Sequence, residues 1–204
     1  MYYILVALLA YIMGSSSMSL YISKWKKVEI RDKGSKNLGA SNAMLVFGWK
    51  YEILVALHDI GKAALAVILA RHFFPGLEHI GIVAGVASVL GHIFPFYLGF
   101  KGGKGFASYL GMTIALNWKL ALVILLLVVL VTWITDYIVV GTTLTVLSVP
   151  TYFGFATQSW IAPAILLIAT GVILYKHRMN FVKIYNGTEI GFRSANRGEH
   201  RASR

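Results

Sequence analysis

Two lysines are interleaved with three glycines in the stretch KGGKG, residues 101–105, which follows an apolar run. Ammonium groups attract anions, and glycine lets the backbone turn its N–H groups toward one. A helix beginning at Phe106 would add the positive end of its dipole. The stretch is not a Walker A loop, because Leu98 stands where that motif needs glycine and Gly105 follows Lys104 in place of serine or threonine. It indicates phosphate binding, and the alternative is a loop that is only flexible and basic.

Two further segments group polar side chains between glycines. Residues 34–42 read GSKNLGASN, and residues 177–189 read HRMNFVKIYNGTE. The plainer interpretation of the first is a turn-rich connector, and that of the second is a solvated basic tail. Together with residues 101–105 they make three donor-rich segments, which we expect on one side of a membrane. We interpret them as one anion site at the membrane surface.

The chain that must position these segments is strongly apolar. Of its 204 residues 57% are hydrophobic and only 13% are charged, whereas a soluble domain carries roughly 25% charged residues. This predicts an all-α integral membrane protein and disfavours nucleic-acid binding. The absence of cysteine removes disulfides and thiolate nucleophiles, and no HExxH motif occurs, so no metal site and no cofactor are expected.

The apolar runs predict about seven transmembrane helices in a single domain of residues 1–204, with a short basic tail from about residue 190. The fourth is too short to cross about 30 Å as a helix, so a re-entrant piece and a total of five crossings stay open. The predicted spans are Tyr2–Ile22, Ile53–Phe73, Ile80–Leu98, Phe106–Leu116, Lys119–Ile134, Ile138–Ala156 and Ile161–Tyr175.

The basic residues predict the orientation of the chain. Seven of the 19 Lys and Arg residues lie between Lys24 and Lys50, and seven lie between Lys176 and Arg204. Cytoplasmic loops carry an excess of such residues. We therefore expect the N-terminus outside, the C-terminus in the cytoplasm, and all three polar segments on the cytoplasmic side.

Ionisable residues also occur inside the expected spans. Asp59 and Lys62 are three residues apart, so they share a helix face and can pair. A structural ion pair and the charged wall of an interior site are both open, because a charge in the bilayer is costly and often functional. For His58 we favour a packed histidine bonded to a backbone carbonyl, and His92 has the same alternative.

The three polar segments together resemble the motifs of the bacterial acyl-phosphate:glycerol-3-phosphate acyltransferases, the PlsY family. The family patterns run approximately GSGNxGATN, GHxFPxxxxFKGGKGxAT and HxxNxxRLxxGxE. Here they read GSKNLGASN (34–42), GHIFPFYLGFKGGKGFAS (91–108) and HRMNFVKIYNGTE (177–189). Their order, spacing and membrane setting agree over nearly the whole chain.

The resemblance implies a seven-helix enzyme of phospholipid biosynthesis in the bacterial cell membrane, with its active site facing the cytoplasm. Such an enzyme transfers a fatty acyl group from acyl phosphate to the 1-hydroxyl of sn-glycerol 3-phosphate, giving lysophosphatidic acid and phosphate. Its partners are these two substrates and the lipid bilayer, and we expect a monomer. No His is followed five positions later by Asp, the pattern of the soluble-headed acyltransferases.

The resemblance also implies the site residues. His177, Ser35 and Lys104 are the expected catalytic residues, with His177 or the leaving phosphate taking the hydroxyl proton. Lys104 and the Gly102–Gly103 amides would hold phosphate, while Ser35, His177 and Asn180 orient the acceptor. The expected substrate-binding residues are Asn37, Asn42, Lys101, Gly102, Gly103, Thr142, Asn180 and Glu189.

Four positions depart from the family pattern. Lys36 replaces a glycine, Leu45 and Lys183 replace arginines, and Thr142 replaces a serine. An arginine binds phosphate through two parallel hydrogen bonds, which leucine cannot make. The alternative functions are therefore a degenerate paralogue and a non-catalytic membrane protein that binds a phosphorylated solute.

Overall fold

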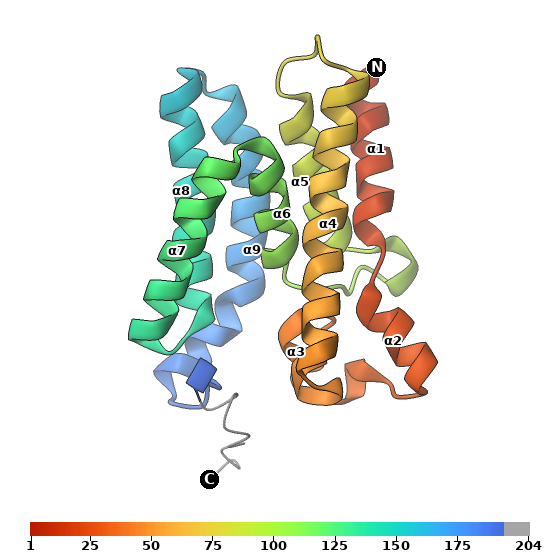
Figure 1. Ribbon diagram of the computed structural model, residues 1–204, viewed down its shortest axis with the longest axis vertical. Coiled ribbons are helices and arrows are strands. Elements are labelled where there is room, and N and C mark those ends of the chain that lie inside the picture. The colour runs from red at the N-terminus through yellow and green to blue at the C-terminus, as the bar shows by residue number, and fades with distance from the viewer. Residues whose placement is uncertain (194–204) are drawn as a thin grey trace. The chain divides into compact units, whose positions relative to one another are not determined.

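The computed structural model describes residues 1–193, and every regular element among them is a helix (Figure 1). The helices are α1 (Tyr2–Ser15), α2 (Met18–Lys26), η1 (Ile30–Asp32), α3 (Ala40–Phe47), α4 (Trp49–Phe73), α5 (Ile80–Ile93), η2 (Phe96–Leu98), α6 (Phe106–Leu116), α7 (Trp118–Thr135), α8 (Ile138–Thr157) and α9 (Ile161–Tyr185). The all-α prediction is confirmed for these residues. The basic tail expected from about residue 190 falls largely on residues 194–204, outside the described part.

Six segments of the described chain are long and apolar enough to cross a membrane. Two of them, Tyr2–Lys26 and Ile80–Leu98, are each built from two helical pieces, and the other four are α4, α7, α8 and α9. Helix α6 has the predicted bounds, but its 11 residues span only roughly 16 Å at 1.5 Å per residue. The predicted count of seven therefore depends on this short helix.

The described residues form two compact units, Met1–Trp118 and the part from Lys119 onward, and each is described by itself. In the first unit α1 packs against α5, and α4 packs against α5 and α6. Glycines permit the close approach: a β-carbon at Gly14 would overlap the carbonyl of Ser88, and one at Gly111 would overlap that of Ile60. Such contacts between backbones hold membrane helices together by van der Waals packing.

The first apolar segment is interrupted between α1 and α2. Ser16 and Ser17 have extended backbone conformations. The carbonyls of Ser15 and Ser16 therefore lack the backbone donors that a continuous helix would provide. Side chains replace those partners: Tyr97 Oη donates to the Ser15 carbonyl at 2.6 Å, and Lys62 Nζ donates to the Ser16 carbonyl at 2.8 Å. Broken helices within a membrane depend on such replacements.

In the second unit α8 packs against α9, and the Thr170 hydroxyl of α9 donates to the Val146 carbonyl of α8 at 2.8 Å. The segment after α9 folds onto the turn between α7 and α8. There the amide of Arg193 donates to Asp136 Oδ1 at 2.9 Å, and the amide of Phe192 donates to the Asp136 carbonyl at 2.8 Å. Helix α9 is thus bonded to α8 near its middle, and the segment after it is bonded to the turn between α7 and α8.

Candidate functional site

The loop of residues 34–42 is organised around the side chain of Asn42, which is only 1% exposed. Asn42 Nδ2 lies 3.1 Å from the Ile30 carbonyl, 3.2 Å from that of Lys33 and 2.8 Å from that of Asn37, and Oδ1 accepts the Ser35 amide at 2.7 Å. These bonds occupy both ends of the amide. Asn42 thus holds the loop that carries Ser35 and Asn37, and its expected role in substrate binding stays a prediction.

Ser35, Lys36 and Asn37 line the outer part of this loop. Ser35 and Lys36 are exposed, and Asn37 is half-buried with its Oδ1 accepting the Leu38 amide at 3.0 Å. Lys36 has φ of 60°, in the left-handed region that favours glycine. The glycine of the family pattern at this position is therefore explained by the backbone, and Lys36 adopts the same conformation at a steric cost.

Leu45 lies beside the start of the same loop. It is half-buried on α3, and its Cβ is 3.5 Å from the position that a β-carbon on Gly34 would occupy. A longer cationic side chain at position 45 would thus begin next to the polar loop.

The exposed Glu29 carboxyl lies just before the loop and accepts the Arg31 amide. Hydrogen bonding and charge from Arg31 lower the pKa of this carboxyl.

The lysine–glycine loop folds back onto the end of α5. The amide of Gly103 donates to the His92 carbonyl and that of Gly102 to the Ile93 carbonyl, each at 3.1 Å. A β-carbon at Gly103 would overlap His92 Nε2, and one at Gly102 would overlap the His92 carbonyl. The two amides therefore close the turn onto α5, because backbone groups in this confined place need partners. The expected role of Gly102 and Gly103 in phosphate binding stays a prediction.

The lysines of this loop stand directly before α6. Lys101 is exposed, Lys104 is half-buried, and Gly105 precedes the helix with φ of 96°. The first amides of a helix have no partner within it and carry partial positive charge. Lys101, Lys104 and the start of α6 therefore form the positive part of this segment.

The third polar segment is mainly helical, since α9 runs on to Tyr185, beyond the expected end at Tyr175. His177 and Asn180 are three residues apart on one face of α9, and Glu189 folds back so that Asn180 Nδ2 donates to Glu189 Oε1. His177 is 7% exposed, with Nδ1 2.9 Å from the Ile173 carbonyl. Because a carbonyl only accepts, Nδ1 carries the proton and Nε2 is the basic nitrogen of the neutral ring.

Thr142, the remaining expected site residue, is 1% exposed within α8. It belongs to the second unit with His177, Asn180 and Glu189, whereas the first two polar segments belong to the first unit. Asn180 and Glu189 are brought together in their unit, and Asn42 joins Ser35 to Asn37 in the other.

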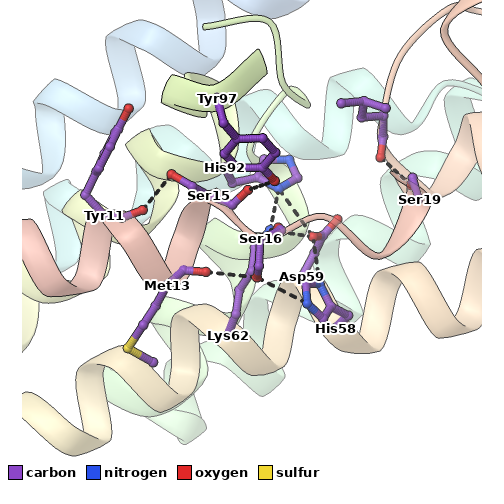
Figure 2. Close-up of polar contacts among 11 residues, drawn as sticks. Tyr11, Met13, Ser15, Ser16, Ser19, His58, Asp59, Lys62, His92 and Tyr97 are labelled. Atoms are coloured by element: carbon purple, nitrogen blue, oxygen red, sulfur yellow. Dashed lines mark hydrogen bonds and ion pairs between the residues drawn. The ribbon is translucent and has the colours of Figure 1, made fainter. Parts of the chain in front are cut away.

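A buried charged cluster also lies in the first unit, and Figure 2 shows its members. Lys62 Nζ is 2.7 Å from Asp59 Oδ1 and 2.9 Å from His92 Nδ1, and the exposures of these residues are 7%, 2% and 8%. The predicted pairing of Asp59 with Lys62 is confirmed. His58 is half-buried with Nε2 3.2 Å from Ser16 Oγ, so it bonds a hydroxyl and not the expected backbone carbonyl.

The sequence did not predict the contact between this cluster and residues 101–105, which His92 makes with Gly103. The signal was present, because His92 stands in the same motif as the lysine–glycine loop. No group of three or more His, Cys, Asp or Glu residues suited to a metal occurs among residues 1–193. In chemical terms, the described residues offer ammonium groups, helix amides and one basic imidazole nitrogen for binding a phosphorylated ligand and moving a proton.

Comparison with known proteins connects this geometry to an activity. A family model described as glycerol-3-phosphate acyltransferase matches residues 4–187. "Glycerol-3-phosphate acyltransferase 1" of Oceanobacillus iheyensis is 37% identical over 199 residues, covering 93% of this chain and 94% of that protein. A glycerol-3-phosphate acyltransferase of Pseudomonas aeruginosa is 34% identical over 192 residues, covering 92% of this chain and 98% of that protein.

Two crystal structures of PlsY, an integral membrane glycerol 3-phosphate acyltransferase, have the same fold. The glycerol 3-phosphate form matches with a TM-score of 0.87 at 29% identity, covering 95% of this chain and 97% of that one. The lysophosphatidic acid form matches with a TM-score of 0.84 at 28% identity, covering 95% and 98%. The similarity thus extends over both units.

Proposed function

This chain belongs to the glycerol-3-phosphate acyltransferase family, and we propose that it transfers a fatty acyl group from acyl phosphate to the 1-hydroxyl of sn-glycerol 3-phosphate. Lysophosphatidic acid and inorganic phosphate are the products. The protein is an integral membrane enzyme of phospholipid synthesis. Acyl transfer to glycerol 3-phosphate is favoured over the alternative of a non-catalytic protein that binds a phosphorylated solute.

One observation carries this function: the chain matches, along nearly its whole length, an enzyme whose two forms are named for the acceptor and the acylated product. The choice of donor is supported by the place of residues 101–105, which follow an apolar membrane segment and precede the N-terminus of α6. An acyl phosphate has an apolar tail and a dianionic head. A lysine-bearing loop next to an apolar helix suits both parts.

We propose direct transfer between the two substrates. The 1-hydroxyl oxygen attacks the acyl carbonyl carbon and forms the ester bond, while the bond from that carbon to the phosphate oxygen breaks and its electron pair leaves with phosphate. The hydroxyl proton passes to Nε2 of His177 or to the departing phosphate. Acyl phosphate is already activated, so the step needs no nucleophile from the enzyme.

The side chains have separate proposed roles. Lys101 and Lys104 bind the donor phosphate, while Ser35 and Asn180 orient the acceptor. Asn42 supports Ser35, and Gly102 and Gly103 set the conformation of the loop that bears the lysines. The other proposed substrate-binding residues are Asn37, Thr142 and Glu189.

We further propose that the enzyme acts as a monomer, with a single catalytic domain that faces the cytoplasm. The family match runs from residue 4 to residue 187 and so includes both compact units, which supports one domain. The clusters of Lys and Arg support the cytoplasmic side for the active site and an external N-terminus.

The function is tested with purified protein in lipid, supplied with glycerol 3-phosphate and, in parallel, acyl phosphate or acyl-CoA. We expect lysophosphatidic acid only with acyl phosphate, and a loss of at least about a hundred-fold in Lys104→Ala, because removing a charged partner from a bound phosphate costs about 3 kcal/mol. Lys50→Ala is the matched control, since Lys50 lies on α4 outside the three polar segments. Product formed from acyl-CoA alone would overturn the choice of donor.

A further inference from the structure

The ammonium of Lys62 is a buried junction with three acceptors around it. It lies 2.7 Å from Asp59 Oδ1, 2.8 Å from the Ser16 carbonyl and 2.9 Å from His92 Nδ1. An ammonium group has three N–H donors, so all three are used. Figure 2 shows Lys62 and Asp59 on α4 directed toward Ser16 and His92. One side chain therefore connects α4, the break between α1 and α2, and the end of α5.

This junction fixes the ring of His92. Because Nδ1 accepts from Lys62, the neutral ring carries its proton on Nε2. Asp59 Oδ1 lies 3.3 Å from the same Nδ1, so the carboxylate and the ring share the Lys62 ammonium as their donor. The Nε2 edge lies against Gly103, where there is no room for a β-carbon. The ring is thus held between the Asp59–Lys62 pair on one side and the lysine–glycine loop on the other.

The backbone of the same residues continues the connection. The His92 and Ile93 carbonyls accept the amides of Gly103 and Gly102. Tyr97, which lies between α5 and the loop, donates to the Ser15 carbonyl at the helix break. The loop is therefore anchored at its turn to His92, a member of the cluster, and the segment before it is anchored to the helix break that Lys62 also contacts.

We propose that Asp59, Lys62 and His92 are positioning residues for the donor phosphate: the cluster holds the His92 ring as the support on which Gly102 and Gly103 set the direction of Lys101 and Lys104. This inference rests on the proposed function, since it assigns those lysines to acyl phosphate. It gives the intramembrane charges a role in catalysis without contact with either substrate.

A double-mutant cycle between His92 and Gly103 tests the inference. The probe is a non-hydrolysable acyl phosphonate, whose dissociation constant is measured by calorimetry alongside the KM for acyl phosphate. We expect Gly103→Ala and His92→Ala each to weaken phosphonate binding about ten-fold, and the double variant to bind no more weakly than His92→Ala, because removing the ring makes room for the new methyl group. Losses that multiply to about a hundred-fold would overturn it.

A second variant separates positioning from stability. His92→Asn keeps an acceptor near the Nδ1 position for Lys62 but removes the edge that supports Gly103. We expect its unfolding temperature to stay near that of the wild type, while the KM for acyl phosphate rises about ten-fold and the KM for glycerol 3-phosphate changes less than about two-fold. Equal effects on both KM values, or a change in stability alone, would contradict the inference.

Gly85→Ala is the matched control for crowding. A β-carbon there would overlap the side chain of Met112, away from the loop, so we expect lower stability with unchanged phosphonate binding. Phosphonate binding and acyl transfer by the wild-type protein distinguish a failure of the proposed function from a failure of this inference. Phosphonate binding without acyl transfer would refute the proposed function and leave the cycle as the test of this inference, whereas a wild type that does not bind the phosphonate would overturn the inference itself.

Discussion

The side-chain oxygen of Asn42 accepts the backbone amide of Ser35 at 2.7 Å, and the amide nitrogen of the same side chain donates to carbonyls of the surrounding loop. One buried residue thus determines where the exposed Ser35 lies. The catalytic role proposed for Ser35 depends on this contact, because the loop has little other regular structure between η1 and α3.

Replacing Asn42 with alanine should therefore damage both stability and activity. The Ser35 amide and three carbonyls of the loop would each lose a hydrogen bond, and each such bond contributes about 0.5–1.5 kcal/mol. We expect a lower unfolding temperature and a loss of acyl transfer, measured by tryptophan fluorescence and by product formation. Ser41→Ala, at the exposed neighbouring position, should change neither. An Asn42→Ala enzyme with wild-type kinetics would exclude the supporting role.

Lys36 should contribute charge to acceptor binding. We expect Lys36→Gly to raise the KM for glycerol 3-phosphate roughly five-fold, since an exposed charge pair contributes up to about 1 kcal/mol. Lys27→Gly is a close control, because Lys27 is also exposed and also left-handed, with φ of 52°. The two variants relieve similar backbone strain. Equal kinetic effects of both would show that the charge of Lys36 has no specific role.

Position 45 offers a test for gain of function. Leu45→Arg would place a guanidinium next to the loop, where it can bind phosphate through two hydrogen bonds. We expect the KM for glycerol 3-phosphate to fall about ten-fold, and Leu45→Gln, which is polar but uncharged, to bring no such gain. Steady-state kinetics at constant acyl phosphate measure the effect. An unchanged KM would mean that Leu45 lies too far from the acceptor phosphate.

The Asp59–Lys62 pair should be more costly to break than to replace. Asp59→Ala leaves the Lys62 ammonium buried without its carboxylate, and we expect a loss of about 3–5 kcal/mol in the free energy of unfolding. Asp59→Leu combined with Lys62→Met should lose less than Asp59→Ala, because no uncompensated charge remains and only the hydrogen bonds to the Ser16 carbonyl and His92 are lost. The five tryptophans report unfolding. A double variant less stable than Asp59→Ala would contradict this account of the pair.

Hydrophobic runs predicted most of the fold. The bounds of α6 and the starts of α5, α8 and α9 lie at the predicted residues, because turn residues and breaks in the apolar pattern mark them. The extension of α9 to Tyr185 was not predicted, since the polar residues from Lys176 onward ended the apolar run but did not end the helix. Apolarity locates a membrane span, whereas helix ends depend on backbone hydrogen bonds.

The sequence did not predict the helix break at Ser16 or the contact of His92 with Gly103, and the reason is different. No proline or glycine occurs at residues 15–17, and the break is stabilised by Lys62 and Tyr97, which are far away in the chain. In the same way, the glycines at 102 and 103 suggested free amides, whereas the fold provides carbonyls of α5 that use them. Contacts of this kind appear only when the helices are packed.

The most direct test of the account is the time course of phosphate release from acyl phosphate by the protein in lipid, with and without glycerol 3-phosphate. Direct transfer predicts no release without the acceptor, and with it one phosphate for each lysophosphatidic acid formed. A rapid burst of about one phosphate per protein without acceptor would reveal an acyl-enzyme intermediate. That result would contradict direct transfer, and no release under any condition from a folded protein would contradict the function itself.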